Sequence, residues 1–402
     1  MALTAIGKTT SNGQQRGPVS LEDSILGFDH VTFWVSNAKQ VAIYYAKLFG
    51  LKPFAYRGLE TNSRRVASHV VKQADIVFQF ESALEPGNTE HGEYLTKHGD
   101  AVKDIALSVV NIELLVDHIR KCGGKIVDEV HEIQDKLSGG QDSVKLARVN
   151  PYGDFTHTLI ERKPGSKFER ATSGCFMPNY APTPLEVANL VDEVDGPGLE
   201  FVDHCVSNQP DHMMEAMVEW YVEKLMMRRF WSVDDSQIYT QYSSLRSVVV
   251  TNKLETVKMP INEPAQGLRK SQIQEFVEYH GEGGIQHIAL HTSDIVHAVR
   301  WLANHGVQFI NTPNAYYDNL EVRLKTASIQ VQEDLRILRE LKILIDYDEQ
   351  GYLLQLFTKP LEDRPTLFIE IIQRHNHNGF GAGNFKSLFE SIEAEQQTRG
   401  NL

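Results

Sequence analysis

The sequence predicts an α+β fold of two domains, each assembled from duplicated βαβββ modules, with an additional helix at the C-terminus. Three observations lead to this prediction: the chain repeats its own motifs, each repeat joins strand-like to helix-like apolar spacing, and a stretch rich in Pro and Gly separates two halves. With 402 residues, of which 41% are hydrophobic, the chain can fill several cores.

The repeats occur at two levels. Phe28-Asp29-His30 is followed by Val35-Ser36-Asn37, and Val202-Asp203-His204 is followed in the same way by Val206-Ser207-Asn208. Further along, Asp104 and His287 are 183 residues apart, and each precedes the sequence Ile-Ala-Leu. The halves of the chain are therefore predicted to be duplicates.

Each repeat predicts the same order of elements. A strand ending in polar residues leads to a helix with apolar residues at Val41, Tyr44, Tyr45 and Leu48, which stops at Gly50. Short strands follow, so the order is βαβββ.

Domain boundaries follow from composition. We predict a disordered polar tail at 1–26, a first domain at 27–163, a linker at 164–198 and a second domain at 199–402 that ends in a helix over 384–398. Lys8 and Arg16 leave a weak organelle-targeting role of the tail as an alternative.

Charge and cysteine content exclude several classes of partner. The net charge is −13 without a basic run, so we expect neither nucleic acid nor an anionic membrane as a partner. The longest apolar stretches, such as Leu353 to Phe357, are far shorter than the roughly 20 residues of a membrane helix. Cys122, Cys175 and Cys205 form no Cys-x-x-Cys pattern, which favours reduced thiols and a cytoplasmic location.

Strand alternation reduces the 16 histidines to few candidate ligands. In the strand that opens the second half, His204 is predicted to share its inward face with Val202 and Val206 and not with Asp203 or Cys205. The corresponding inward sets further along are Ile285, His287, Ala289 and His291, and Thr366, Phe368, Glu370 and Ile372.

A carboxylate among apolar neighbours indicates a bound cation. An unpaired buried Glu370 would cost several kcal/mol, and a metal would remove this penalty. His204, His287 and Glu370 would form the two-histidine, one-carboxylate set that suits Fe(II) and leaves coordination positions open, although zinc fits these ligand types too. His291, His375 and His377 remain competing ligands, and Glu370 could instead pair with Arg374 or Arg364.

The first half serves as an internal control. Its matching positions are predicted to be His30, Asp104 and Glu161, so the middle histidine is missing there. We therefore expect a metal-free first domain and a catalytic second domain.

Several long motifs resemble one known family over Leu26 to Leu402. They are Arg229 to Asp235, Tyr242 to Ser247, Met259 to Pro264, Gly284 to Leu290, Asp363 to Thr366 and Gly379 to Phe385. The chain resembles the eukaryotic 4-hydroxyphenylpyruvate dioxygenases, a family of the vicinal oxygen chelate superfamily, whose fold is glyoxalase-like. The resemblance implies a single Fe(II) per chain, held by His204, His287 and Glu370.

The resemblance also implies a substrate pocket beneath the C-terminal helix. Its catalytic positions would be Ser247, Asn262, Gln272 and Gln355, and its other substrate-binding positions Gln286, Phe357, Phe368, Phe380, Asn384 and Phe385. Alternation places Gln355 with Phe357 on one face, but it turns Gln286 away from His287. For each phenylalanine, plain core packing is an alternative.

The activity implied by the resemblance is conversion of 4-hydroxyphenylpyruvate and O2 to homogentisate in tyrosine catabolism, by a homodimer. Two alternatives stay open. Hydroxymandelate synthase uses the same substrate, iron and fold, and a metal-free duplicate would only bind an oxo acid or a partner protein.

Overall fold

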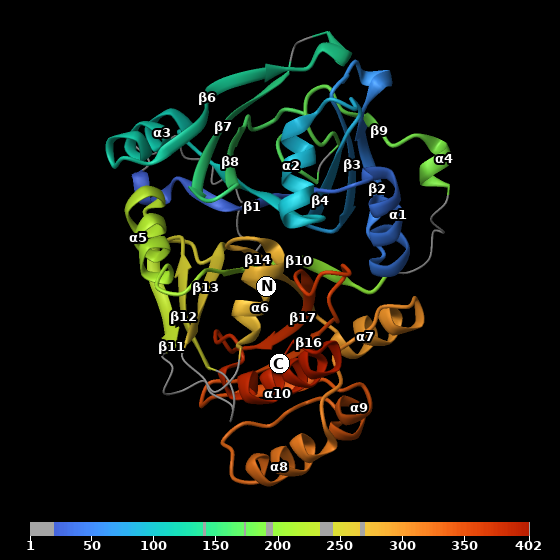
Figure 1. Ribbon diagram of the computed structural model, residues 1–402, viewed down its shortest axis with the longest axis vertical. Helices are drawn as coiled ribbons and strands as arrows, with labels where there is room; N and C mark the ends of the chain where they lie inside the picture. The colour runs from blue at the N-terminus through green and yellow to red at the C-terminus, as the bar shows by residue number, and fades with distance from the viewer. Residues whose placement is uncertain are drawn as a thin grey trace, which may run out of the picture.

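The computed structural model describes residues 20–139, 142–172, 174–189, 196–233, 244–265 and 270–401. Within these ranges the strands form a nine-stranded sheet from the first half and an eight-stranded sheet from the second half (Figure 1). Each sheet is curved and has helices packed along it (Figure 1).

The first sheet has the order β6-β7-β8-β5-β1-β4-β3-β2-β9. Its elements are β1 (Ile25–Trp34), α1 (Ala38–Phe49), β2 (Lys52–Arg57), β3 (Val66–Gln73), β4 (Ile76–Ala83), α2 (Thr89–His98), β5 (Ala101–Val109), α3 (Ile112–Lys121), β6 (Lys125–Gln134), β7 (Ser143–Tyr152) and β8 (Phe155–Arg162). β9 (Ala181–Pro182) and α4 (Leu185–Ala188) follow in the segment predicted to be a linker.

The second sheet has the order β11-β12-β13-β10-β14-β17-β16-β15. Its elements are β10 (Leu199–Asn208), α5 (Met214–Leu225), β11 (Arg228–Val233), β12 (Ser244–Thr251), β13 (Lys258–Ala265), α6 (Gln272–His280), β14 (Gly284–Thr292), α7 (Ile295–Asn304), α8 (Asn314–Leu324), α9 (Leu335–Glu340), β15 (Leu344–Tyr347), β16 (Tyr352–Phe357), β17 (Phe368–His375) and the terminal helix α10 (Phe385–Arg399).

The predicted module order is confirmed. Each half contains two βαβββ units, one beginning at β1 and one at β5 in the first half, and one at β10 and one at β14 in the second. The first helix ends where the sequence predicts, at Gly50, which adopts φ 68°, and it begins after Asn37, whose side chain accepts a hydrogen bond from the backbone N–H of Gln40.

The first strand begins earlier and the linker is more structured than expected. A 3₁₀ turn at Leu21–Asp23 precedes β1, which starts at Ile25, while residues 1–19 of the predicted tail lie outside the described part. In the linker, β9 pairs with β2, and Phe168, Phe176 and Met177 are buried in a core cluster with first-half residues. Much of this segment therefore completes the first half.

The alternation argument for the inward face is partly wrong. The pairing of β10 with β14 shifts register between Val202 and His204, so Val202 and Cys205, three positions apart, both belong to the main core cluster. A second shift pairs Val206 with His287 and Ser207 with Ile285, which leaves Gln286 as an extra residue. The counted face is therefore wrong at Val202 and at Ile285, whereas no shift separates His204 from Val206 or His287 from Ala289, so these pairs share a face as predicted.

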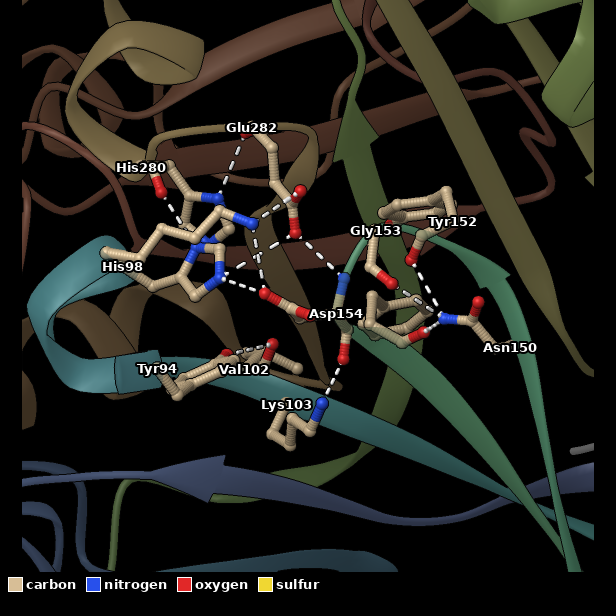
Figure 2. Close-up of polar contacts among 12 residues, drawn as sticks. Tyr94, His98, Val102, Lys103, Asn150, Tyr152, Gly153, Asp154, His280 and Glu282 are labelled. Atoms are coloured by element: carbon tan, nitrogen blue, oxygen red, sulfur yellow. Dashed lines mark hydrogen bonds and ion pairs between the residues drawn. The ribbon is translucent and has the colours of Figure 1, made fainter. Parts of the chain in front are cut away.

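Charged and polar groups join the two halves beside α2 (Figure 2). The Lys97 ammonium donates to Asp154 Oδ2 (3.0 Å) in the first half and to Glu282 Oε2 (2.8 Å) in the second. His98 Nδ1 donates to the His280 carbonyl (2.7 Å), and the backbone N–H of Asp154 donates to Glu282 Oε1 (2.8 Å). These contacts fix the relative position of the halves.

A second contact between the halves is unfavourable at neutral pH. Burial, together with the nearby Asp100 and Asp363 carboxylates, raises the pKa of Glu362 to about 7 from its ordinary 4.5. Burial also raises the pKa of Asp100, which follows α2 in the first half. The folded state binds the Glu362 proton more tightly than the unfolded state. The free energy of unfolding is therefore higher at low pH, where Glu362 is protonated, and it falls as the pH rises through 7.

We therefore expect Glu362→Gln to stabilise the protein at pH 8.5, by about 2 kcal/mol, and to change little at pH 5. Denaturant unfolding at the two pH values measures this difference. Glu349→Gln, on an exposed turn, is the matched control and should leave stability unchanged at both. Equal effects of Glu362→Gln at the two pH values would contradict the assignment.

Candidate metal centre

His204, His287 and Glu370 come from three neighbouring strands of the second sheet. His204 on β10 and Glu370 on β17 both pair with Ala289 of the intervening strand β14, and His287 lies two residues before Ala289. All three functional side chains are buried, with exposed fractions of 2%, 8% and 2%. The parallel and antiparallel pairing thus brings residues 166 positions apart, from His204 to Glu370, to the same point on the sheet.

The three side chains converge on one oxygen atom. His204 Nε2 and His287 Nε2 each lie 3.2 Å from Glu370 Oε2. One ligand atom from each residue lies within 4.8 Å of the others, a spacing that one metal ion can bridge. The two imidazole rings stand nearly perpendicular, with centroids 5.7 Å apart.

Neighbouring groups set the orientation of both imidazoles. His204 Nδ1 donates to the Asp203 carboxylate at 2.7 Å, and His287 Nδ1 lies 2.9 Å from the side-chain oxygen of Gln286. When Nδ1 carries the proton, the lone pair of the neutral ring is on Nε2, which faces the centre. Both rings therefore present a metal-binding nitrogen to Glu370.

The electrostatics keep the carboxylate charged. Burial opposes ionisation of Glu370, but the adjacent His204 and His287 lower its pKa to about 2. Burial also disfavours charged His204, yet Glu370 and Asp203 raise the pKa of that ring, whereas burial lowers the pKa of His287. The Oε1 atom of Glu370 is buried without a hydrogen-bond partner among the described residues, so this anion has a free ligand oxygen.

The competing ligands lie elsewhere. His291 Nδ1 pairs with Glu200 at 3.0 Å, and His375 Nε2 pairs with Glu333 at 3.0 Å. His377 Nδ1 accepts from the backbone N–H of Gly379. These three histidines are outside the group that converges on Glu370.

The proposed ion-pair partners of Glu370 are engaged with other groups. Arg374 binds Asp203, and Arg364 donates to the backbone carbonyls of Thr96 and Lys97 in the first half. Glu370 is therefore not the carboxylate of an arginine ion pair.

The expected first-half counterpart of Glu370 is wrong. Asp104 is the first-half equivalent of His287; it pairs with Thr156, whereas His287 pairs with Phe368. Glu370 lies two residues after Phe368, so its equivalent lies two residues after Thr156, which is Thr158. The Asp104 carboxylate accepts hydrogen bonds from the Thr156 and Thr158 hydroxyls, at 2.5 and 3.0 Å. The first half therefore lacks both the second histidine and the carboxylate.

Glu161 instead matches Gln373. Glu161 Oε2 accepts from the backbone N–H of Ile112 at the start of α3, and Gln373 Oε1 accepts from that of Ile295 at the start of α7. Glu161 therefore lies three positions beyond Thr158, the residue that the strand pairing matches to Glu370.

A second group of possible ligands lies at the junction of the halves. His98, Asp154 and Glu282 bring ligand atoms within 4.8 Å of one another (Figure 2). There the Lys97 ammonium already binds both carboxylates, and Asp154 is exposed. The charge of this group is therefore balanced by protein, unlike that of Glu370.

Three of the positions predicted to bind substrate lie in one pocket. Gln272 at the start of α6, Gln286 and Phe368 line one pocket together with Thr366 and Ile392, the last of which belongs to α10. The terminal helix therefore covers this pocket.

The prediction that Gln286 points away from His287 is wrong, because the extra residue in β14 turns its amide toward that ring.

The polar positions on the inner strands are buried. Ser247 and Asn262 are paired residues of β12 and β13, and Asn262 Nδ2 donates to Asn208 Oδ1 at 3.2 Å. Gln355 on β16 is fully buried, and both polar atoms of its amide lack a partner among the described residues. Asn384 Oδ1 accepts from the Tyr316 hydroxyl at 2.7 Å, which leaves its amide nitrogen available.

Aromatic side chains enclose the two histidines. The Phe368 ring stacks on His287 with centroids 4.8 Å apart, and Phe357 meets the same ring edge-on at 6.0 Å. Phe380 meets His204 edge-on at 5.2 Å. The side chain of Phe385 lies outside the described part, so its predicted role stays a prediction.

Two residues of the site were not predicted. Asn208 ends β10 beside Asn262 and has a buried side-chain nitrogen without a partner in the described ranges. The sequence feature that could have identified Asn208 is the repeated Val-Ser-Asn motif. Asn37 of the first copy caps a helix, whereas Asn208 of the second copy does not. Asp203, adjacent to His204, was counted only as a residue that points outward.

Comparisons with known proteins agree on one family. Residues 201–356 match the Glyoxalase/Bleomycin resistance protein/Dioxygenase superfamily. A 4-hydroxyphenylpyruvate dioxygenase of Xenopus tropicalis is 53% identical over 96% of this chain and 95% of its own length, and one of Dictyostelium discoideum is 50% identical over 94% of this chain and 100% of its own. The solved structure of a mutant 4-hydroxymandelate synthase from Streptomyces coelicolor superimposes with a TM-score of 0.78 at 27% identity, covering 93% of this chain and 99% of that one.

We expect His204→Ala to abolish binding of a divalent metal, because only one imidazole and one carboxylate would remain. Metal content of the purified variant, measured by mass spectrometry after loading with Fe(II), tests this. His291→Ala is the matched control, since this histidine lies two residues beyond Ala289 and pairs with Glu200. Full metal content in His204→Ala, or equal loss in both variants, would contradict the assignment.

Proposed function

The chain belongs to the 4-hydroxyphenylpyruvate dioxygenase family, and from this premise we propose that it converts 4-hydroxyphenylpyruvate and O2 to homogentisate and carbon dioxide. We propose a single Fe(II) per chain as its cofactor, with His204, His287 and Glu370 as ligands. The relatives that carry the family name span nearly the whole chain at about half identity, which supports the activity.

One observation carries the metal assignment. Two imidazoles direct Nε2 toward the same carboxylate oxygen, each at 3.2 Å, in a buried site. If both rings were neutral and held their protons on Nδ1, two lone pairs would face an anionic oxygen, which is unfavourable at low dielectric constant. A divalent cation between these atoms reverses the sign of the interaction.

The donor types favour iron among the divalent metals. Two neutral nitrogens and one carboxylate oxygen leave coordination positions for a chelating oxo acid and for oxygen, and zinc remains compatible with the ligands alone. When bound, Fe(II) would supply the redox chemistry by which O2 reacts with the substrate. No further organic cofactor is required, because the substrate contains the 2-oxo acid group that related oxygenases take from a separate cosubstrate.

The protein would bind and orient the substrate. Ser247, Asn262, Gln272, Gln286 and Gln355 offer hydroxyl and amide groups for the polar ends of the substrate, and the buried unpartnered amide of Gln355 supports this role most directly. Since each such group has a fixed strand or helix position, the substrate would bind in one orientation.

The aromatic residues would hold the ring and exclude water. Phe357, Phe368 and Phe380 lie around the two histidines, and Asn384 and Phe385 lie at the start of α10. We propose that these positions, with α10 above them, close the site during turnover.

Cellular context is part of the proposal. The three free cysteines, one of them fully buried, support a reducing cytoplasm, and the family supports a homodimer that acts in tyrosine catabolism. Among the described helices, none has the length and apolar composition needed to cross a bilayer.

A second candidate is hydroxymandelate synthase activity, which the superposition with that enzyme favours. Both reactions would use the same ligands, and the position of the substrate ring decides between them. The higher identity to the dioxygenases, 53% against 27%, favours ring hydroxylation.

We expect protein loaded anaerobically with Fe(II) to form homogentisate from 4-hydroxyphenylpyruvate and O2. Chromatography with mass spectrometry identifies the product, and His291→Ala should behave like the unchanged protein while His204→Ala should be inactive. Hydroxymandelate as the main product would establish the second candidate, and lack of product from fully loaded protein would refute both.

A further inference from the structure

Both halves contain the same four-residue cluster, which we call the quartet. In the first half Asp29 binds His30 Nδ1 (2.8 Å) and the guanidinium of Arg162 (2.7 and 2.8 Å), and the Phe176 ring meets His30 edge-on at 4.9 Å. Each residue of this quartet is buried or half-buried. No metal-binding triad accompanies it among the described residues of this half.

The second quartet includes a proposed metal ligand. Asp203 binds His204 Nδ1 (2.7 Å) and Arg374 (Nε at 2.8 Å and Nη2 at 2.7 Å), and the Phe380 ring meets His204 edge-on at 5.2 Å. The guanidinium carbon of Arg374 lies 5.5 Å from the centre of the Phe380 ring. Burial opposes charge on Asp203, but Arg374 and His204 hold its pKa well below the ordinary value.

The remaining guanidinium nitrogen of Arg374 holds the chain that follows β17. Nη1 donates to the carbonyl oxygens of His377 (3.1 Å) and Gly379 (2.6 Å). Arg162 does the same after β8, where its Nη1 donates to the carbonyls of Phe168 (3.2 Å) and Phe176 (2.8 Å). In each half one arginine therefore fixes both a histidine, through an aspartate, and the segment after the last strand.

The two segments end differently. After Arg162, the side chains of Phe168, Phe176 and Met177 are packed into a core cluster with first-half residues. After Arg374, residues 377–384 lead into α10, which covers the pocket of the second half. In the second half the arginine connects His204, a proposed metal ligand, with the segment that leads into the helix over the pocket.

We propose that Arg374 is a positioning residue that couples the orientation of His204 to the ordering of residues 377–384 over the site. The inference rests on the proposed function, because it takes His204 as a metal ligand. A planar fork with donors on all three nitrogens can hold one carboxylate and two carbonyls at the same time, which a lysine ammonium cannot reproduce. Coupling of this kind is reciprocal, so metal binding favours the ordered segment as much as the ordered segment favours metal binding.

The test compares Arg374→Lys with Arg162→Lys, its counterpart in the first half. The affinity of the apoprotein for Co²⁺ is measured by visible absorption, and amide hydrogen exchange of residues 377–384 is measured with and without Co²⁺. We expect Arg374→Lys to weaken Co²⁺ binding about tenfold and to remove the protection of 377–384 that Co²⁺ produces. Arg162→Lys should lower the melting temperature while leaving both quantities at their wild-type values.

The steady-state parameters provide a further readout. In Arg374→Lys we expect KM for the oxo acid to rise and product formed per O2 consumed to fall, because the segment closes less completely. Loss of melting temperature alone, with unchanged Co²⁺ affinity and exchange, would overturn the proposal.

A second pair of variants applies if Arg374→Lys fails to fold. Asp203→Asn keeps the size of the side chain and removes its charge, and Asp29→Asn is its counterpart. Weakened Co²⁺ binding and faster exchange of 377–384 only in Asp203→Asn would support the coupling, and equal behaviour of the two variants would overturn it. Co²⁺ affinity and hydrogen exchange do not depend on which product the enzyme forms. The proposed function is tested separately, by identifying the product of the wild-type protein.

Discussion

The candidate metal centre of the second half depends on one buried contact, between the carboxylate of Glu370 and two imidazole nitrogens. Inside a protein, an ionised carboxylate is stable only with compensating positive charge or hydrogen bonds. Here the nitrogens of His204 and His287 approach the same oxygen, while Asp203 and Gln286 hold the opposite side of each ring. The outer contacts determine which nitrogen faces inward, and thereby make this a ligand set for a cation.

Duplication explains why one half has this site and the other does not. The halves have the same strand order and the same quartet around His30 and His204, so the scaffold tolerates the loss of the triad. In the first half Asp104 is satisfied by threonine hydroxyls, and aromatic side chains from the following segment fill the interior. Among its described residues, this half has no second histidine at the position that matches His287, which is Asp104.

Sequence reasoning predicted the modules and the three ligands, but some of its geometric arguments were wrong. Strict alternation fails at Asp203 and at Gln286, where β10 and β14 shift register. Such a shift changes which face a side chain occupies, and a single sequence carries no signal that distinguishes a bulged residue from a paired one. Glu161 was also not the counterpart of Glu370, because the pairing of the parallel strands puts Thr158 at that place.

By itself the sequence determined the duplicated α+β fold, the family and the residue types of the centre, because repeats, apolar periodicity and motifs are local properties of the chain. Only the tertiary structure decided which oxygen the histidines face, that Arg374 serves Asp203 and not Glu370, and that α10 covers the pocket. These depend on strand register and on contacts between residues far apart in the sequence, such as His287 with Glu370 and Asp203 with Arg374, where a shift of one residue changes every partner.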